Sequence, residues 1–151
     1  MIEINNLTRF KFDKKRLERL AGKVLERESS FAKATEDKGK EFDLSITFVR
    51  QKEIQKLNKK YRKIDRPTDV LSFTYMNSGE IVLCPQIIKQ NAERFGETFK
   101  GELTRVLIHG ILHILGYNHK ESLPAGRQGG IKAEKMRKKE EYYNSSVARN
   151  I

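Results

Sequence analysis

The strongest constraint on this chain of 151 residues is a segment from Leu103 to Leu115, where apolar residues fall on most sides of a helix. Such a segment predicts a buried helix at the centre of the fold. Two histidines interrupt it, His109 and His113, and their offset of four residues places both rings on one face, one turn apart. The predicted core helix therefore carries a pair of reactive groups.

All three histidines of the chain lie between His109 and His119. Gly116 predicts a helix stop because glycine accepts the left-handed conformation, so the chain can turn back and bring His119 towards the other two rings. Three neutral imidazoles leave a fourth tetrahedral position open for water, as in catalytic zinc sites. The alternative is three ordinary polar residues that coincide. We expect one Zn²⁺ per chain, bound by His109, His113 and His119.

The rest of the chain predicts strands that alternate with helices. Strands are expected at 2–6, 42–49, 70–75 and 80–84, and helices from Asp13, around 54–61, from Pro85, over 103–115 and at about 132–143. Polar and turn-forming residues near 29–40 and 121–130 predict surface loops. The pattern indicates an α/β or α+β class with a small sheet, and the length fits one domain, 1–151.

Composition narrows the class of partner. Hydrophobic residues make up 37% of the chain, which is enough for a folded core, and 31 Lys and Arg against 20 Asp and Glu give a charge of +11. This charge favours a polyanion such as nucleic acid, or else a basic surface that only keeps the protein soluble. A single cysteine, Cys84, excludes an internal disulfide. No signal peptide or membrane span is predicted, so a cytoplasmic location is expected.

The histidine spacing also resembles that of the metzincin proteases, which raises a peptidase as a rival. In those enzymes a glutamate directly follows the first histidine and serves as the general base. Gly110 occupies that position here. The spacing therefore supports a metal site more strongly than it supports a protease.

Upstream, the stretch LNKKYRKIDRPTDVLSF (57–73) predicts a helix end, a proline turn and the start of a strand. Arg62 lies near that turn. Its guanidinium is either a solvated charge or a group that forms paired hydrogen bonds with a phosphate.

This stretch, followed by GEIVLCP and HGILHILGYNH, resembles the three signature blocks of the YbeY family. Members are single-domain, metal-dependent endoribonucleases linked to ribosomal RNA maturation, and the resemblance covers about residues 44–119. It implies an α+β fold with a small mixed sheet packed against several helices, zinc on the three histidines, and Arg62 beside the metal in an RNA-facing cleft. It further implies a single-strand-specific hydrolase for 16S ribosomal RNA processing and ribosome quality control, with the small ribosomal subunit as a partner and no DNA or membrane partner.

Two departures accompany the resemblance. Asn118 stands where the family usually has Asp, and the segment around 121–130 looks inserted.

The expected reaction is phosphodiester cleavage by a metal-activated water or ribose hydroxyl, with Arg62 and the metal stabilising the developing charge. A metal-dependent hydrolase of another substrate and a noncatalytic ribosome-binding factor with structural zinc remain as alternatives. No general base is chosen among the carboxylates near the motifs, which are Asp65, Asp69, Glu80 and Glu102.

Overall fold

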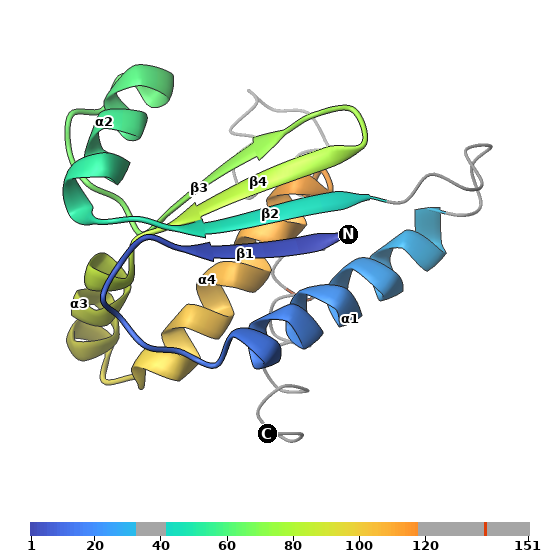
Figure 1. Cartoon of the computed structure of the whole chain (residues 1–151), viewed down its shortest axis with the longest axis horizontal. Helices are drawn as coiled ribbons and strands as arrows, with labels where there is room; N and C mark the ends of the chain where they lie inside the picture. The colour runs from blue at the N-terminus through green and yellow to red at the C-terminus, as the bar shows by residue number, and fades with distance from the viewer. Residues whose placement is uncertain (33–41, 118–137, 139–151) are drawn as a thin grey trace.

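The computed structural model describes residues 1–32, 42–117 and 138, which form one mixed four-stranded sheet with helices on both faces (Figure 1). The strands are β1 (Ile2–Asn6), β2 (Asp43–Phe48), β3 (Val70–Thr74) and β4 (Ser78–Leu83), in the spatial order β1-β2-β4-β3. The helices are α1 (Lys14–Ala32), α2 (Gln51–Arg62), α3 (Pro85–Phe95) and α4 (Phe99–Ile114). Strands β1, β2 and β4 are parallel, and β3 lies antiparallel to β4 at an edge. The predicted α+β class is confirmed.

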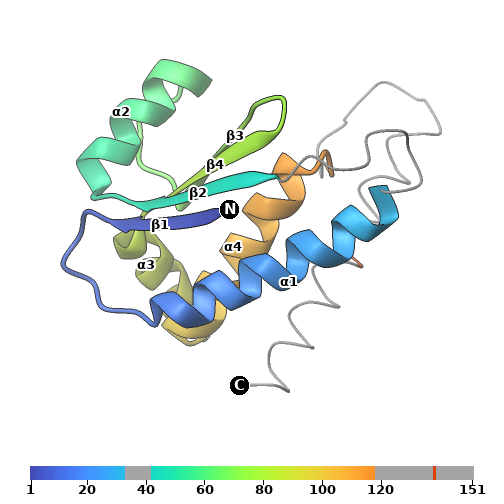
Figure 2. The same cartoon turned by 45° about the vertical axis from the view of Figure 1, so that its right-hand side comes forward.

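The two faces of the sheet are covered differently. Helices α1 and α4 lie against one face (Figure 2), where Ile81 and Leu83 of β4 join the larger apolar core. Helix α2 lies on the other face, where its Ile54 packs with Leu71 of β3 and Val82 of β4. We call these the α4 face and the α2 face. The division follows from the alternation of side chains along each strand.

Local signals set the ends of the helices. The amide of Arg16 donates to the Asp13 carboxylate at 3.0 Å, which confirms the predicted start of α1. The amide of Gly101 donates to the Thr98 hydroxyl at 3.0 Å and fixes the start of α4. Gly116, with φ +89°, follows the end of α4 in the left-handed region, as predicted.

Some boundaries differ from the prediction. Helix α1 continues to Ala32, so the expected loop from residue 29 is helical at its start. Strand β4 begins at Ser78 because the amide of Tyr75 donates to the Ser78 carbonyl at 2.8 Å, which closes a shorter turn than expected. The expected loop at 121–130 lies outside the described residues, as does the expected last helix apart from Lys138.

Cys84 is fully buried. Burial raises the pKa of its thiol, so the group stays neutral near pH 7. Cys84 packs as a small apolar residue of the core beside Ile54, Leu71 and Val82. Within the described ranges, no helix combines the length and the apolar character that crossing a membrane requires.

Helix α4 approaches the sheet closely at two glycines. A Cβ at Gly79 of β4 would lie 2.5 Å from a methyl group of Ile114, and a Cβ at Gly110 would lie 3.2 Å from Ile81. The same hypothetical Cβ at Gly110 would lie 3.3 Å from the Ser72 hydroxyl of β3. The absence of side chains at these two positions sets how near the end of α4 lies to β3 and β4.

Replacing Gly79 by alanine should destabilise the protein by about 1–3 kcal/mol, because the new methyl group overlaps the Ile114 side chain. The cost should fall when Ile114→Ala is added, since that change removes the overlapping atoms. Urea unfolding of both single variants and the double variant measures this coupling. Gly22→Ala in α1 is the matched control, because its Cβ meets nothing closer than 3.8 Å and alanine favours a helix. Additive single-variant costs would contradict the close approach.

Candidate functional site

The candidate site is a narrow, partly exposed stripe on α4. From Glu102 to Ile114, every residue is buried except Arg105, His109 and His113. These three residues follow one another at intervals of four, so they lie on one side of the helix. The rest of the helix is held by the core, and therefore only this stripe can meet a ligand.

The two histidine rings converge within the stripe. The Nε2 atoms of His109 and His113 lie 2.9 Å apart, and the ring centroids lie 4.5 Å apart at an interplanar angle of 69°. At this distance one Nε2 can donate a hydrogen bond to the other, in the direction that the tautomers set, or both nitrogens can bind one cation. Tetrahedral Zn²⁺ with Zn–N bonds of about 2.0–2.1 Å separates two ligand nitrogens by roughly 3.3 Å. The two imidazoles thus fit two positions of such an ion with a small adjustment.

The third predicted ligand, His119, lies outside the described residues. Among residues 1–32, 42–117 and 138, no third histidine, cysteine or carboxylate joins the pair. The structure therefore brings together two of the three predicted ligands, and the role of His119 stays a prediction.

Arg105 is a member of the stripe that sequence reasoning missed. Its Nε donates to Glu102 Oε2 at 3.1 Å and its Nη2 donates to Oε1 at 2.5 Å. Glu102 is 2% exposed, so this fork neutralises a buried carboxylate and positions the guanidinium one turn before His109. The signal was present in the sequence as the spacing of four between Arg105 and His109.

The other carboxylates near the motifs lie elsewhere. Asp65 pairs with Lys59 at 3.5 Å and accepts a hydrogen bond from Gln55. Glu80 lies between Gly79 and Ile81, which point to the α4 face, so its side chain points to the α2 face. Asp69 accepts a hydrogen bond from Thr68. None of these contacts connects a carboxylate to the histidine pair.

Arg62 and the histidines belong to helices that cover opposite faces of the sheet. Arg62 is the exposed last residue of α2, and it forms no hydrogen bond or ion pair with any residue that the structure describes. Beside it, the Tyr61 ring meets Phe73 of β3 edge-on, at 5.0 Å between centroids. The neighbouring Ser72 hydroxyl donates to the Gly110 carbonyl at 3.4 Å on the α4 face. Among the described residues no contact joins Arg62 to the histidine pair, and the predicted place of Arg62 beside the metal stays a prediction.

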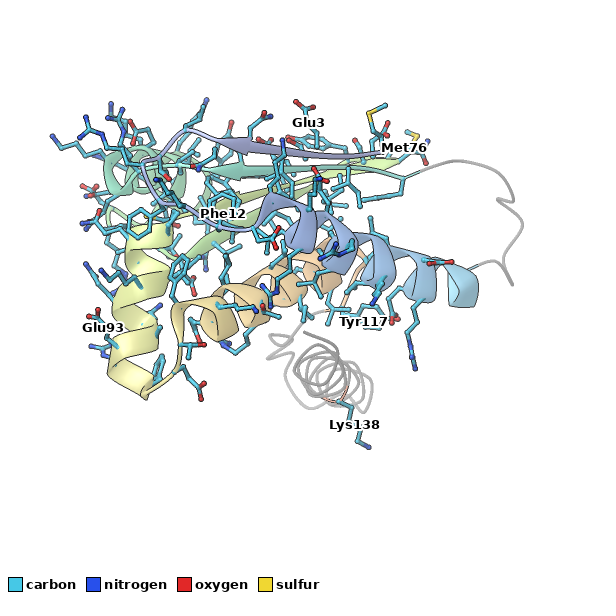
Figure 3. The ribbon with its side chains drawn as sticks, turned by 60° about the horizontal axis from the view of Figure 1, so that its bottom comes forward. Glu3, Phe12, Met76, Glu93, Tyr117 and Lys138 are labelled. Atoms are coloured by element: carbon cyan, nitrogen blue, oxygen red, sulfur yellow. The ribbon has the colours of Figure 1, made fainter. Side chains whose placement is uncertain are left out.

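A buried contact from α1 anchors the chain where it leaves α4. The Tyr117 hydroxyl donates to Glu28 Oε2 at 3.0 Å, and Glu28 is 5% exposed. The Tyr117 amide also donates to the Leu112 carbonyl at 2.9 Å. Helix α1 therefore fixes the position of Tyr117, two residues before the third predicted ligand in the sequence. Figure 3 shows Tyr117 beneath α1.

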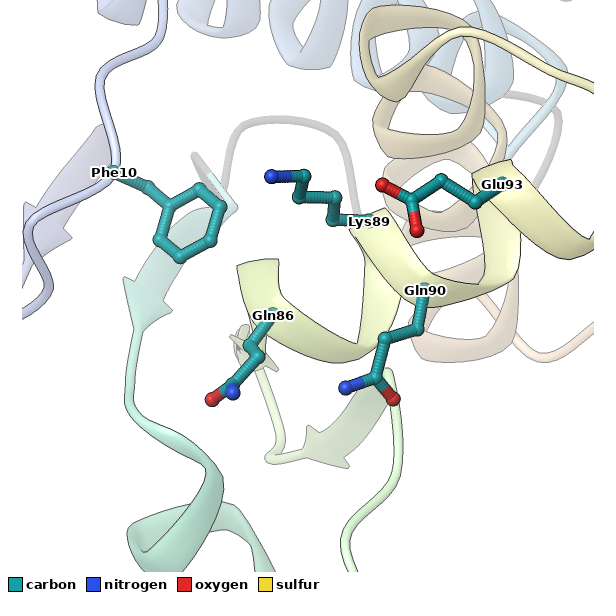
Figure 4. A pocket seen from close by; sticks show the side chains of 5 residues that line it. All are labelled: Phe10, Gln86, Lys89, Gln90 and Glu93. Atoms are coloured by element: carbon teal, nitrogen blue, oxygen red, sulfur yellow. The ribbon is translucent and has the colours of Figure 1, made fainter.

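A shallow depression on the surface lies apart from the stripe (Figure 4). It opens between the connection after β1 and helix α3, and none of its lining residues is a histidine. Its lining residues are Phe10, Gln86, Lys89, Gln90 and Glu93. The depression therefore plays no part in the candidate site.

The substitution Tyr117→Phe should lower the free energy of unfolding by about 1.5–3 kcal/mol, because it removes a donor from a buried carboxylate. The matched control is Tyr75→Phe, whose ring is 56% exposed and which should change stability by less than about 0.5 kcal/mol. Urea unfolding measures both. Equal effects in the two variants would show that the contact between Tyr117 and Glu28 does not hold the end of α4.

The family model described as endoribonuclease YbeY matches residues 3–148. The endoribonuclease YbeY of Aliarcobacter butzleri is 34% identical over 158 residues, which cover 99% of each chain. The protein of the same name from Thermotoga petrophila is 47% identical over 79 residues, so this chain spans about half (53%) of that relative. The solution structure of TM1509 from Thermotoga maritima matches with a TM-score of 0.62 and 35% identity over 97% of this chain and 89% of that one. The chain therefore belongs to the YbeY family of endoribonucleases.

Proposed function

We propose that this chain is a zinc-dependent endoribonuclease that cleaves single-stranded RNA in the cytoplasm. The observation that carries the proposal is the convergence of the His109 and His113 Nε2 atoms, at 2.9 Å, on the partly exposed stripe of α4. Family membership supports RNA as the substrate, and the charge of +11 suits a polyanion. We further propose processing of 16S ribosomal RNA, ribosome quality control and the small ribosomal subunit as the setting, as the family resemblance implies.

The residues of the stripe have different roles in the proposed reaction. His109, His113 and the predicted His119 hold the ion, which when bound supplies a Lewis acid and lowers the pKa of water. Arg105 offers a guanidinium beside the pair, already oriented by Glu102, for hydrogen bonds to a phosphate. Arg62, at the exposed end of α2, contacts a phosphate of the same RNA. The buried remainder of α4 keeps the rings in place and excludes water from beneath them.

The peptidase alternative loses support at Gly110. A protease with this histidine spacing uses a glutamate at that position. Here Gly110 points into the sheet, where a Cβ would already lie 3.2 Å from Ile81 and 3.3 Å from the Ser72 hydroxyl. A carboxylate built there would enter an apolar core rather than the site.

The function is tested by offering structured ribosomal RNA and casein separately to the same metal-loaded protein, with and without chelator. We expect RNA cleavage that the chelator abolishes and no cleavage of casein. His113→Ala should lose most of the bound metal, measured by elemental analysis, and most of the cleavage, because it removes one of the two converging nitrogens. Parallel preparation of this variant also controls for contaminating nuclease.

Two outcomes would contradict the proposal. Chelator-sensitive cleavage of casein with intact RNA would establish the peptidase. RNA binding without cleavage, together with bound metal, would establish the noncatalytic ribosome-binding factor with structural zinc.

Arg62→Ala should retain the melting temperature and the metal but lose about tenfold or more in the rate of RNA cleavage, because an exposed guanidinium contributes to phosphate contacts and not to the core, and a lost hydrogen bond to a charged group costs about 1.5–3 kcal/mol. Lysine at this position should restore little, since it lacks the planar fork. Arg94→Ala on α3 serves as the control for loss of an exposed arginine. A large fall in melting temperature in Arg62→Ala would make the residue structural.

A further inference from the structure

The positive charge of the chain is concentrated around α2. Residues 50–66 contain eight basic and two acidic residues, so this short stretch carries a surplus of six of the eleven net positive charges. The acidic residues are paired, Glu53 with Arg50 at 3.0 Å and Asp65 with Lys59 at 3.5 Å. All the basic side chains are exposed, and they are Arg50, Lys52, Lys56, Lys59, Lys60, Arg62, Lys63 and Arg66. By comparison, α3 and α4 each carry a surplus of one.

Two exposed aromatic rings lie beside this charge. Tyr61 follows Ile54 and Leu57 at helical spacing, which predicts a buried stripe, but its side chain is 55% exposed. Its ring meets Phe73 of β3 edge-on. Tyr75 is 56% exposed and lies one residue past the end of β3, where it continues the alternation of Leu71 and Phe73 and so points to the α2 face. The hydrogen bond from the Tyr75 amide to the Ser78 carbonyl fixes the backbone of Tyr75 in the hairpin.

These rings do little for the core. Within the described part of the chain, neither phenol donates a hydrogen bond to a protein group, and the next residue, Met76, is 93% exposed at the end of the sheet (Figure 3). Lys60 Nζ lies 5.1 Å from the centre of the Tyr61 ring. Single exposed aromatic residues are common on protein surfaces. Two on one face, next to a concentrated basic helix, form the combination by which proteins bind single-stranded nucleic acid.

We propose that α2 and the β3–β4 hairpin form a track for single-stranded RNA, in which bases stack on Tyr61 and Tyr75 while lysines of α2 contact the phosphates. This inference rests on the proposed function and adds to it. The RNA crosses β3, whose Ser72 touches α4 at Gly110, and so passes from the track on one face to the histidine stripe on the other. Paired RNA cannot use the track because its bases are already stacked within the duplex.

The test uses the metal-loaded full chain and a fluorescent, unstructured RNA of 12 nucleotides with 2′-O-methyl riboses, checked afterwards for integrity. Binding is measured by anisotropy for this RNA and for an abasic strand of the same length. The double variant Tyr61→Leu with Tyr75→Leu should bind the RNA about tenfold more weakly, because the bases no longer have rings on which to stack. Tyr61→Phe with Tyr75→Phe should bind within about threefold of the unmodified chain, since both rings remain.

Two controls isolate stacking from general effects. Phe95→Leu removes an aromatic ring that is 61% exposed on α3 and should leave binding unchanged. The abasic strand should bind all of these proteins equally, because it offers phosphates but no bases.

The phosphate contacts are tested by the salt dependence of binding. Lys56→Gln, Lys60→Gln and Lys63→Gln together should lower the slope of log K against log salt by about 0.7 for each phosphate that a lysine no longer neutralises. Lys15→Gln, Lys23→Gln and Lys89→Gln remove the same charge from α1 and α3 and should leave the slope near that of the unmodified chain.

The proposed track is rejected if the leucine double variant binds the RNA as tightly as the unmodified chain. This face would then be a binding surface for a protein partner. The track is also rejected if that variant binds the abasic strand more weakly to the same extent, or if both lysine sets change the slope alike. If the double variant does not fold, the RNA affinity of Tyr75→Leu alone is the test, because Tyr75 is exposed at the hairpin turn and its replacement should not affect folding. If RNA binding does not depend on the two tyrosines but unmodified RNA is still cleaved, only the track is rejected. Tyrosine-dependent binding without any cleavage rejects the proposed function alone.

Discussion

The close approach of α4 to strands β3 and β4 is the constraint on which the rest of the structure depends. It is set by two positions without side chains, Gly79 opposite Ile114 and Gly110 opposite Ile81. With the helix held this near, its residues enter the core from almost every direction, and only one side of it reaches the surface. That side carries Arg105, His109 and His113, so the same packing that stabilises the fold also defines the site.

The sheet separates two kinds of chemistry. On the α4 face, a pair of imidazoles and a guanidinium paired with a buried carboxylate are held by buried neighbours. On the α2 face, exposed basic side chains predominate, with Tyr61 and Phe73 as the aromatic contact between helix and sheet. Rigid groups suit catalysis, which requires fixed geometry, whereas exposed lysines suit the sequence-independent attraction of a phosphate backbone. The edge strand β3 is shared by both regions.

Periodicity and end signals predicted much of this arrangement. The buried character of α4, the stop at Gly116, the cap at Asp13 and the alternation in β2 depend on residues close in sequence, and all of them are present. The exposure of Tyr61 was not predictable, because its apolar spacing fits a buried stripe and only tertiary packing leaves it outside. The contact between Glu28 and Tyr117 joins residues 89 positions apart, and no local pattern encodes it. Which face of the sheet α2 covers, opposite to α4, likewise depends on tertiary packing.

The central claim, that the stripe of α4 is a zinc site, is tested most directly by X-ray absorption at the zinc edge of the metal-loaded chain. A zinc ion on this stripe should show three imidazole nitrogens at about 2.0–2.1 Å, and one imidazole fewer in His113→Ala. A spectrum without imidazole scattering, or one that His113→Ala leaves unchanged, would contradict the claim.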